Sequence, residues 1–311
     1  MIGHDLDAAA ETRAAASDDG RLAQYLAAWQ LGDPQLLAQT RTSRVYTVTC
    51  DASTAVLKLL ATHEREEQRG ALALRHFDGR GAVRLLRADD GAQLLEYAAG
   101  DELVTLVARG DDAHATRIIA QVLAQLHSPP ADAAPASLVP LDRWFHALFA
   151  RAEADRQAGV PSIYVRGAAV AERLLATARE VCVLHGDIHH YNIRQSPRGW
   201  LAFDPKGLLG ERTYDCANAL CNPVMPELVF DAERLLRNAA ILADGLDLDV
   251  QRVLAFTYAY ACLNASWWLE LGDDEILRWS LDVAALVEPH LDWTTIYATH
   301  VPVSVPASQS S

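Results

Sequence analysis

Residues able to carry out phosphoryl transfer occur in and just after one short segment in the middle of the chain. Residues 185–192 read HGDIHHYN, and a later apolar run, residues 200–203, ends at Asp204. A carboxylate such as Asp187 can accept the proton of a hydroxyl group or orient that group for attack. The oxygens of Asn192 and Asp204 are of the hard type that Mg²⁺ requires. This order and spacing predict phosphoryl transfer, which needs mainly positioning and charge neutralisation.

A lysine lies in an apolar strand nearer the start of the chain. Residues 54–60 are strand-like, and both faces are apolar because Val56 and Leu60 flank Lys58 on its own face. Burying an unpaired ammonium group costs several kcal/mol, so we expect Lys58 to bind a phosphate. The alternative is a lysine on an edge strand whose ammonium group reaches water.

An acidic helix follows this strand and supplies the expected counter-charge. Glu67 aligns with Ala71 and Leu74 at helical spacing and so faces inward, whereas Glu64 lies three residues earlier on nearly the same face. We therefore predict that Glu67 pairs with Lys58, and Glu64 is the alternative.

A polar turn precedes the strands. Residues 40–46 read TRTSRVY, and their backbone N–H groups and hydroxyls, including that of Ser43, could cover the phosphates of a nucleotide. The turn has no glycine, and alone it is a weak signal.

Three histidines in the central motif suggest a different chemistry. His185, His189 and His190, together with Asp187, could ligate Zn²⁺ in a metal-dependent hydrolase. Their order, H-x-D-x-H-H, does not match the usual zinc spacings. We therefore expect His185 to support the backbone of the loop, with the hydrolase as the alternative.

The hydrophobic pattern predicts an α+β protein of two lobes. Strands are expected as a hairpin of residues 44–50 and 54–60 and as a second pair, 82–87 and 93–97, joined by a turn at 89–91. Helices are expected at 21–31, 64–77, 101–109, 112–127, 141–158, 167–180, 231–243, 249–271 and 273–287. The predicted organisation is a disordered leader (1–20), a nucleotide-binding N-lobe (21–97), a mainly helical C-lobe (98–301) with a catalytic hairpin (181–204), and a flexible tail (302–311).

Composition narrows the class of protein. The chain has 311 residues, 50% of them hydrophobic, and a net charge of −14 that argues against nucleic-acid binding. Its 5 cysteines are scattered, which favours reduced thiols. The start of the chain lacks the apolar core of a signal peptide, and no apolar run is long enough to span a membrane. We expect a cytoplasmic protein without a membrane partner, either a monomer or a homodimer.

The central motif followed by Asp204 resembles the catalytic and metal-binding motifs of the aminoglycoside phosphotransferase family, whose fold is protein-kinase-like. Within this family the chain is most similar to the branch of streptomycin 6-kinases and hydroxyurea phosphotransferases. The stretch 200–218, WLAFDPKGLLGERTYDCAN, carries this closer likeness. The resemblance extends over residues 40–225, with weaker similarity at both ends.

The resemblance implies a role for each residue of the predicted site. Asp187 would be the catalytic base, and Asn192 and Asp204 would hold Mg²⁺. Lys58 would bind the α- and β-phosphates of ATP while pairing with Glu67.

The resemblance also implies supporting positions around this site. Asp215 matches an acidic residue that steadies the catalytic loop. Residues 95–98 would form a hinge whose backbone, at Glu96 and Ala98, meets the adenine. Residues 204–206 read DPK rather than the DFG of protein kinases, so no switching of an activation loop is expected.

The implied activity is ATP-dependent phosphorylation of a hydroxyl of an aminoglycoside antibiotic, above all streptomycin at its 6-position, which would confer resistance. Hydroxyurea or another small metabolite is the alternative acceptor, and a non-catalytic nucleotide-binding module is a further one. A small cationic, hydroxylated acceptor such as streptomycin, with its guanidinium groups, calls for carboxylates and aromatic rings. Candidates on the helical side are Glu211, Trp267, Trp268, Glu270, Asp273 and Asp274, although each also fits an ordinary amphipathic helix.

Overall fold

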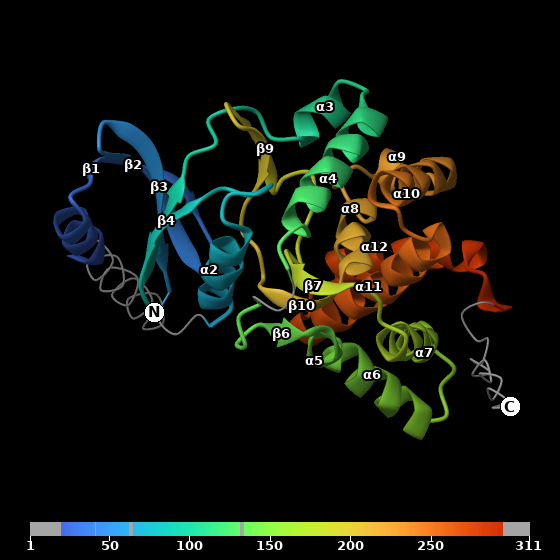
Figure 1. Ribbon diagram of the computed structural model, residues 1–311. Helices are drawn as coiled ribbons and strands as arrows, with labels where there is room; N and C mark the ends of the chain where they lie inside the picture. Colours follow the sequence, from blue (N-terminus) through green and yellow to red (C-terminus); the bar gives the residue numbers. More distant parts are fainter. Residues whose placement is uncertain (1–19, 41, 62–64, 131–133, 295–311) are drawn as a thin grey trace, which may run out of the picture.

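The computed structural model describes residues 20–40, 42–61, 65–130 and 134–294. Residues 1–19 of the predicted leader, the predicted tail and Glu64 lie outside these ranges. Two lobes lie side by side, a β-sheet lobe formed by the first part of the chain and a mainly helical lobe formed by the rest (Figure 1). The predicted α+β fold with a β-rich N-lobe is therefore confirmed.

A five-stranded antiparallel sheet forms most of the N-lobe. Its order is β1-β2-β3-β5-β4, with the bounds β1 (Gly32–Gln39), β2 (Ser43–Cys50), β3 (Ser53–Leu60), β4 (Leu85–Ala88) and β5 (Ala92–Glu96). Both predicted strand pairs are present. Strand β1 was missed because its start reads as a helix stop, and because Leu36 and Leu37 are both exposed, which breaks the alternation expected of a strand.

The two faces of this sheet have different partners. Ala55, Leu57 and Leu59 of β3 pack in a small apolar cluster with Trp29, which ends the helix of residues 20–29. Lys58 points to the opposite face, where it meets helix α2 (Arg65–Phe77). The strand alternation thus places the lysine on the side that faces the rest of the molecule.

Helices dominate the second part of the chain and share one large apolar core. The predicted helices appear as α3 (Val104–Ala108), α4 (Asp112–Leu126), α5 (Leu141–Trp144), α6 (His146–Gln157), α7 (Ile163–Ala176), α10 (Ala232–Leu246), α11 (Val250–Leu271) and α12 (Asp274–Val287). Those not predicted are the short α8 (Ala217–Leu220), α9 (Pro226–Val229), η2 (Arg212–Cys216) and η3 (Glu288–His290). Within the described ranges, no helix is both long and apolar enough to cross a membrane.

The prediction that residues 181–204 form one hairpin is wrong. Strand β7 (Val181–Leu184) pairs with β10 (Leu208–Glu211), which also pairs with β6 (Val139–Pro140). The actual hairpin joins β8 (Ile193–Ser196) to β9 (Gly199–Ala202). The two apolar runs therefore belong to different small sheets, and the loop that carries the HGDIHHYN motif crosses from one sheet to the other.

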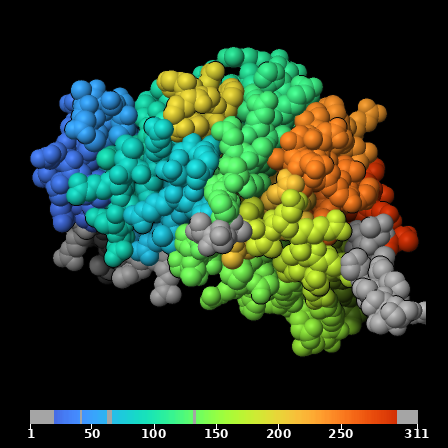
Figure 2. Space-filling model, in the orientation of Figure 1, coloured from blue at the N-terminus to red at the C-terminus, as the bar shows by residue number. Residues whose placement is uncertain are grey.

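The β8–β9 hairpin connects the two lobes. It lies at the surface between the sheet lobe and helices α3 and α4 (Figure 2, yellow). Arg198 at its tip binds the carboxylate of Glu96 at 2.5 and 2.8 Å and the carbonyl oxygen of Gly79 at 2.8 Å. Residue 202 also pairs with residues 81–83 through backbone hydrogen bonds. The hairpin is thus held against the N-lobe at both ends.

Candidate active site

Lys58 joins the two lobes at the centre of the candidate site. Its ammonium nitrogen lies 2.5 Å from Glu67 Oε2 and 2.5 Å from Asp204 Oδ1. Glu67 belongs to the first turn of α2, and Asp204 follows β9. The expected pairing of Lys58 with Glu67 is therefore present, and the same lysine also reaches Asp204, which lies 146 residues further along the chain.

The charges of this cluster stabilise one another. Burial lowers the pKa of Lys58, but the carboxylates of Asp204 and Glu67 raise it more, so the pKa lies above its ordinary value. Partial burial raises the pKa of Asp204, but the ammonium groups of Lys58 and Lys206 lower it below its ordinary value. Both groups are thus charged at neutral pH. The backbone of Asp204 has a φ of +65°, a left-handed conformation that is uncommon for a residue other than glycine and is often found at functional sites.

The polar turn before β2 lies over this cluster. Thr42 donates its hydroxyl to Glu67 Oε1 at 3.0 Å, which brings the turn to the opening beside Lys58. Ser43 is buried, and its hydroxyl lies 3.2 Å from Thr40 Oγ1. The turn is therefore near enough to contribute backbone groups and the hydroxyl of Thr42, whereas Ser43 serves the shape of the turn.

Asp187 is oriented by neighbours from three segments. Asn218 of α8 donates to Asp187 Oδ1 at 2.8 Å, and Asn192 donates to its carbonyl oxygen at 3.0 Å. Lys206 Nζ lies 3.5 Å from Asp187 Oδ2. Asn222 in turn donates to the side-chain oxygen of Asn218 at 2.9 Å, so Asp187 sits at the end of an amide chain. These contacts fix the orientation of the Asp187 carboxylate.

The loop that carries Asp187 is fixed from below by a buried carboxylate. Asp215 accepts the backbone N–H groups of His185 at 2.9 Å and Gly186 at 2.7 Å. His127 Nε2 lies 2.9 Å from the same carboxylate. His185 Nε2 lies 3.0 Å from the carbonyl oxygen of Phe203, and its Nδ1 accepts the N–H of Asp187 at 3.2 Å. These contacts place Asp215 and His185 where a supporting role requires them.

The histidines of the motif do not form a metal site. His185 is fully buried and uses both ring nitrogens on the backbone, as described above. His190 is also buried, and this burial lowers its pKa to about 3. In the described part of the chain, no group of three or more His, Cys, Asp or Glu side chains is arranged to hold a metal ion. The metal-dependent hydrolase reading therefore has no structural support.

Asn192 and Asp204 are brought together by the β8–β9 hairpin. The N–H of Phe203 donates to the carbonyl oxygen of Asn192 at 3.0 Å, so Asp204 follows directly beside Asn192. Asn192 uses its Nδ2 on Asp187, and Asp204 uses its Oδ1 on Lys58. As far as the described residues go, Asn192 Oδ1 and Asp204 Oδ2 therefore remain available to a ligand. Two hard oxygens fit Mg²⁺, which would complete its shell with phosphate oxygens and water.

The predicted hinge, residues 95–98, connects the lobes, but the side chain of Glu96 is used within the protein and not to bind a nucleotide. The carboxylate of Glu96 binds Arg198 and accepts the N–H of Arg84 at 3.0 Å, and its own N–H donates to the carbonyl oxygen of Arg84. Ala98, in contrast, lies beyond the end of β5, and its backbone groups make no turn or loop hydrogen bond within the described part of the chain. Ala98 is thus the better placed of the two predicted positions to meet a base.

The arrangement now described can be compared with known proteins. Over residues 28–272 the sequence matches the family described as aminoglycoside/hydroxyurea antibiotic resistance kinase. The chain belongs to this family. It is 37% identical to streptomycin 3''-kinase of Klebsiella pneumoniae, over 82% of this chain and 95% of that protein. It is 33% identical to streptomycin 6-kinase of Streptomyces griseus, over 77% of this chain and 79% of that protein.

A solved structure supports the fold of this family member. An amicoumacin kinase in complex with AMP-PNP, Ca²⁺ and Ami superposes with a TM-score of 0.61 at 15% identity, over 88% of this chain and 96% of that one. At this identity the likeness shows the kinase-like fold and no more.

Most of the candidate acceptor residues of this family member are engaged in contacts within the protein. Glu211 is buried and bound by Arg252 at 2.5 Å, so the expectation that it contacts an acceptor is wrong. Asp273 caps the start of α12 by accepting the N–H groups of residues 275 and 276. Trp267 packs edge-on against Trp144, and Trp268 donates to an amide of its own helix. Glu270 and Asp274 are exposed at the ends of α11 and α12.

Sequence reasoning missed three residues of the site, namely His127, Lys206 and Asn218. Asn218 could have been found, because it follows Asp215 at a spacing of three, which places both on one face of a helical turn. His127 and Lys206 make contacts with distant segments, which no local sequence pattern predicts.

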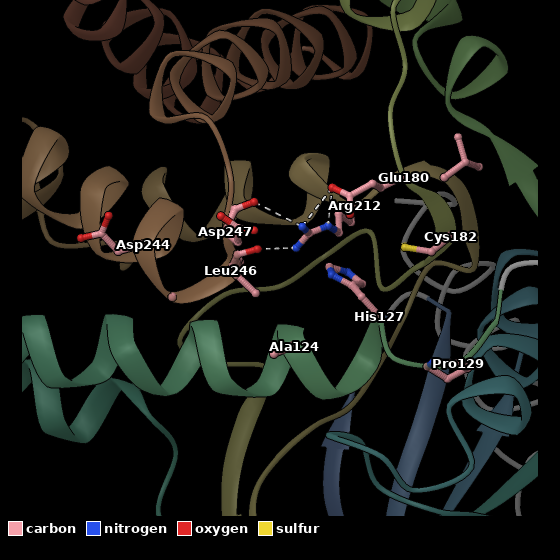
Figure 3. Close-up of a pocket in the computed structure, with 11 residues that line it drawn as sticks. Ala124, His127, Pro129, Glu180, Cys182, Arg212, Asp244, Leu246 and Asp247 are labelled. Carbon is pink, nitrogen blue, oxygen red and sulfur yellow. Dashed lines mark hydrogen bonds and ion pairs between the residues drawn. The ribbon is translucent and has the colours of Figure 1, made fainter.

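A pocket of about 560 Å³ lies behind the catalytic loop rather than at the cleft. It is lined by the end of α4, the start of β7 and the end of α10, and Arg212 crosses it to bind Glu180 and the carbonyl oxygen of Leu246 (Figure 3). Of the site residues described above, His127 lines this pocket, whereas Lys58, Asp187, Asn192 and Asp204 do not. The candidate site is therefore defined by the ion pairs around Lys58 and not by this pocket.

Proposed function

We propose that this family member is an ATP-dependent O-phosphotransferase that phosphorylates a hydroxyl of streptomycin. The observation that carries the proposal is the double ion pair of Lys58 with Glu67 and Asp204, beside the oriented carboxylate of Asp187. This set contains a phosphate-binding cation, hard oxygens and a proton acceptor, which is the inventory that phosphoryl transfer needs. The antibiotic-kinase family supplies the class of acceptor.

Each residue has a defined part in the proposed reaction. Lys58 binds the α- and β-phosphates of ATP, and Glu67 keeps its ammonium group in place. Asn192 and Asp204 hold Mg²⁺, which when bound neutralises phosphate charge. Asp187 accepts a hydrogen bond from the acceptor hydroxyl and takes its proton as the oxygen attacks. Asp215 and His185 keep the loop of Asp187 rigid, and Ala98 offers its backbone to the adenine.

Streptomycin is favoured as the acceptor by the relatives. Proteins 37% and 33% identical to this chain are named for phosphorylation of its 3''- and 6-positions respectively. The expected 6-hydroxyl and the 3''-hydroxyl are therefore both candidates. Hydroxyurea is the second candidate acceptor, because the family description and a relative of 34% identity carry its name.

The cellular setting follows from the same proposal. We place the enzyme in the cytoplasm, as a monomer or homodimer, where it would inactivate the antibiotic and confer resistance. All five cysteines are free, which suits a reducing compartment. We place the boundary between the two lobes at residues 97 and 98, which lie between the end of β5 and the start of α3.

An ATP-consumption screen tests the proposed function. The purified chain is incubated with MgATP and streptomycin, hydroxyurea or no acceptor, and ADP formation is followed. We expect ADP formation that depends on streptomycin, and NMR of the product gives the phosphorylated position. Turnover with hydroxyurea alone would select the second candidate, and no acceptor-dependent ADP from any tested compound would contradict the proposal.

A further inference from the structure

Lys206 is a second lysine at the site, and its backbone is fixed by close contact with α2. Its N–H donates to the carbonyl oxygen of His185 at 2.7 Å. The neighbouring Gly207 has a φ of +68°, and a Cβ there would lie 2.5 Å from the carbonyl oxygen of Arg69. A Cβ on Gly70 would lie 2.4 Å from the carbonyl oxygen of Pro205. Two glycines thus let the backbones of α2 and residues 205–207 touch, which fixes the origin of the Lys206 side chain.

The ammonium group of Lys206 lies among the carboxylates of the site. Its nitrogen is 3.1 Å from Glu66 Oε1 and 3.5 Å from Asp187 Oδ2. Burial lowers its pKa, but the carboxylates of Asp187, Asp204 and Glu66 raise it more, so the pKa lies above its ordinary value. Of the Lys206 side chain, 26% is exposed to solvent. Lys206 is therefore a charged group that a ligand can reach.

Lys58 and Lys206 form a matched pair. Adjacent glutamates of the first turn of α2 bind one lysine each, Glu67 binding Lys58 and Glu66 binding Lys206. At its other side each lysine meets a carboxylate of the reaction site, Asp204 for the first and Asp187 for the second. Lys58, beside Asp204, consequently lies on the metal side of the position where a phosphoryl group would be transferred. Lys206, beside Asp187, lies on the acceptor side of that position.

We propose that Lys206 is a catalytic residue whose ammonium group contacts the γ-phosphoryl group during transfer, an inference that rests on the proposed function. The acceptor oxygen forms a bond to the γ-phosphorus, and the bond from that phosphorus to the β–γ bridging oxygen breaks, with its electron pair leaving on ADP. The proton of the acceptor hydroxyl passes to Asp187. Lys206 keeps its protons and donates hydrogen bonds to the non-bridging oxygens, where charge is spread in the transition state.

The simpler role for Lys206 is a structural link between α2 and the loop of Asp187. The two roles differ in what happens when Glu66 is neutralised. A structural link needs both partners, so Glu66→Gln would then do the same damage as loss of the lysine. A lysine that serves the phosphoryl group is freed by Glu66→Gln, and binding of a γ-phosphate is retained.

Nucleotide affinities separate a contact to the γ-phosphate from every other role. Dissociation constants of ADP and AMP-PNP are measured by calorimetry with Mg²⁺ for the wild type, Lys206→Met, Lys206→Arg and Glu66→Gln. For Lys206→Met we expect unchanged ADP affinity and about tenfold weaker AMP-PNP, since a hydrogen bond to a charged group is lost. Lys206→Arg should recover part of the difference, and Glu66→Gln should keep wild-type AMP-PNP affinity. The control Lys58→Met should weaken both nucleotides.

The turnover number provides the second readout. Loss of a donor aimed at charge that develops in the transition state lowers kcat by about 10²–10³, and we expect this for Lys206→Met. Unchanged AMP-PNP affinity of Lys206→Met, or equal weakening of both nucleotides, would overturn the inference. If Lys206→Met does not fold, Lys206→Gln takes its place in the same comparison. A wild type that phosphorylates no acceptor sinks the proposed function, and the two affinities still decide the role of Lys206 in binding.

Discussion

Lys58 is shared between two carboxylates. Burying these charges costs hydration free energy, so a contribution to folding stability does not by itself explain the arrangement. A buried ion pair gains little net stability, because the loss of hydration offsets the attraction. Here Glu67 and Asp204 place two negative charges around one ammonium group, so the cluster has an excess of negative charge. This excess of negative charge favours the binding of a divalent cation beside Asp204. Once the cation is bound to Asp204, the ammonium group of Lys58 is available to bind phosphate.

The role of Glu67 can be tested by a substitution that preserves its shape. Glu67→Gln removes one of the two charges that hold the ammonium group of Lys58, so Asp204 is left as its only charged partner in this cluster. We expect kcat/KM for ATP to fall by about 10- to 100-fold, the range for a lost hydrogen bond between charged groups. Steady-state kinetics at varied ATP concentration measures this, with Asp78→Asn, an exposed carboxylate just after α2, as the control. A Glu67→Gln enzyme with wild-type kcat/KM would show that Lys58 needs no anchor on α2.

The sequence allows these residues to be predicted to different extents. Lys58 and Glu67 follow from local rules, because strand alternation places the lysine on the inner face and helical spacing places the glutamate opposite. His127 and Lys206 do not follow, because their partners lie on other elements. His127, for example, is 88 residues from Asp215, and only the packing of α4 against the catalytic loop brings them together.

At the scale of elements, helices α4 and α10 are held together by a buried carboxylate. Asp112, at the start of α4, accepts hydrogen bonds from Arg234, Arg237 and Asn238 of α10 at 2.8–3.0 Å. The Arg234 side chain is among the most deeply buried in the protein. Burial raises the pKa of Asp112, but the hydrogen bonds from Arg234 and Asn238 and the charge of Arg234 lower it below its ordinary value. Removing the carboxylate would leave a buried guanidinium group without its partner.

Loss of Asp112 is expected to destabilise the helical lobe. Asp112→Ala should lower the free energy of unfolding by about 3–5 kcal/mol, the cost of breaking a buried pair, whereas the double variant Asp112→Leu, Arg234→Met should cost less. Because the pKa is lower in the folded state, the stabilisation is complete above the ordinary carboxyl pKa of about 4 and is lost as pH falls below it. Denaturant unfolding at pH 7 and at pH 3.5 measures both effects. If Asp112→Ala and the wild type lost stability equally between these pH values, the pair would not be the cause.

The prediction of elements succeeded where one periodicity ran through a long segment. Helices α4 and α10 have apolar residues at helical spacing, and α11 is a long segment that is mostly apolar. Strand β7 was also recognised, but its partners β6 and β10 could not be, because pairing depends on contacts between distant segments. Its apolar run was therefore assigned to a hairpin with the wrong partner.

At the scale of the whole molecule, the site is assembled where the two lobes meet. The N-lobe provides Lys58 from β3 and the two glutamates from α2, and the helical lobe provides Asp187, Asn192 and the segment that begins at Asp204 (Figure 1). The order of the two lobes was predictable, because strand-like segments come first and helical segments follow. The acceptor was not predictable from the fold, because Glu211, Trp267 and Asp273 are engaged in contacts within the helical lobe.

The most direct test of the central claim is the rate of phosphate transfer to streptomycin by Asp187→Asn. The amide has the shape of the carboxylate but cannot take the proton of the acceptor hydroxyl, so kcat should fall by about 10²–10⁴. AMP-PNP affinity should stay within about twofold of the wild type, because Asp187 faces the acceptor. The control Asp282→Asn changes an exposed carboxylate on α12 and should leave both quantities unchanged. An Asp187→Asn enzyme that transfers phosphate at the wild-type rate would contradict the mechanism proposed for this cleft.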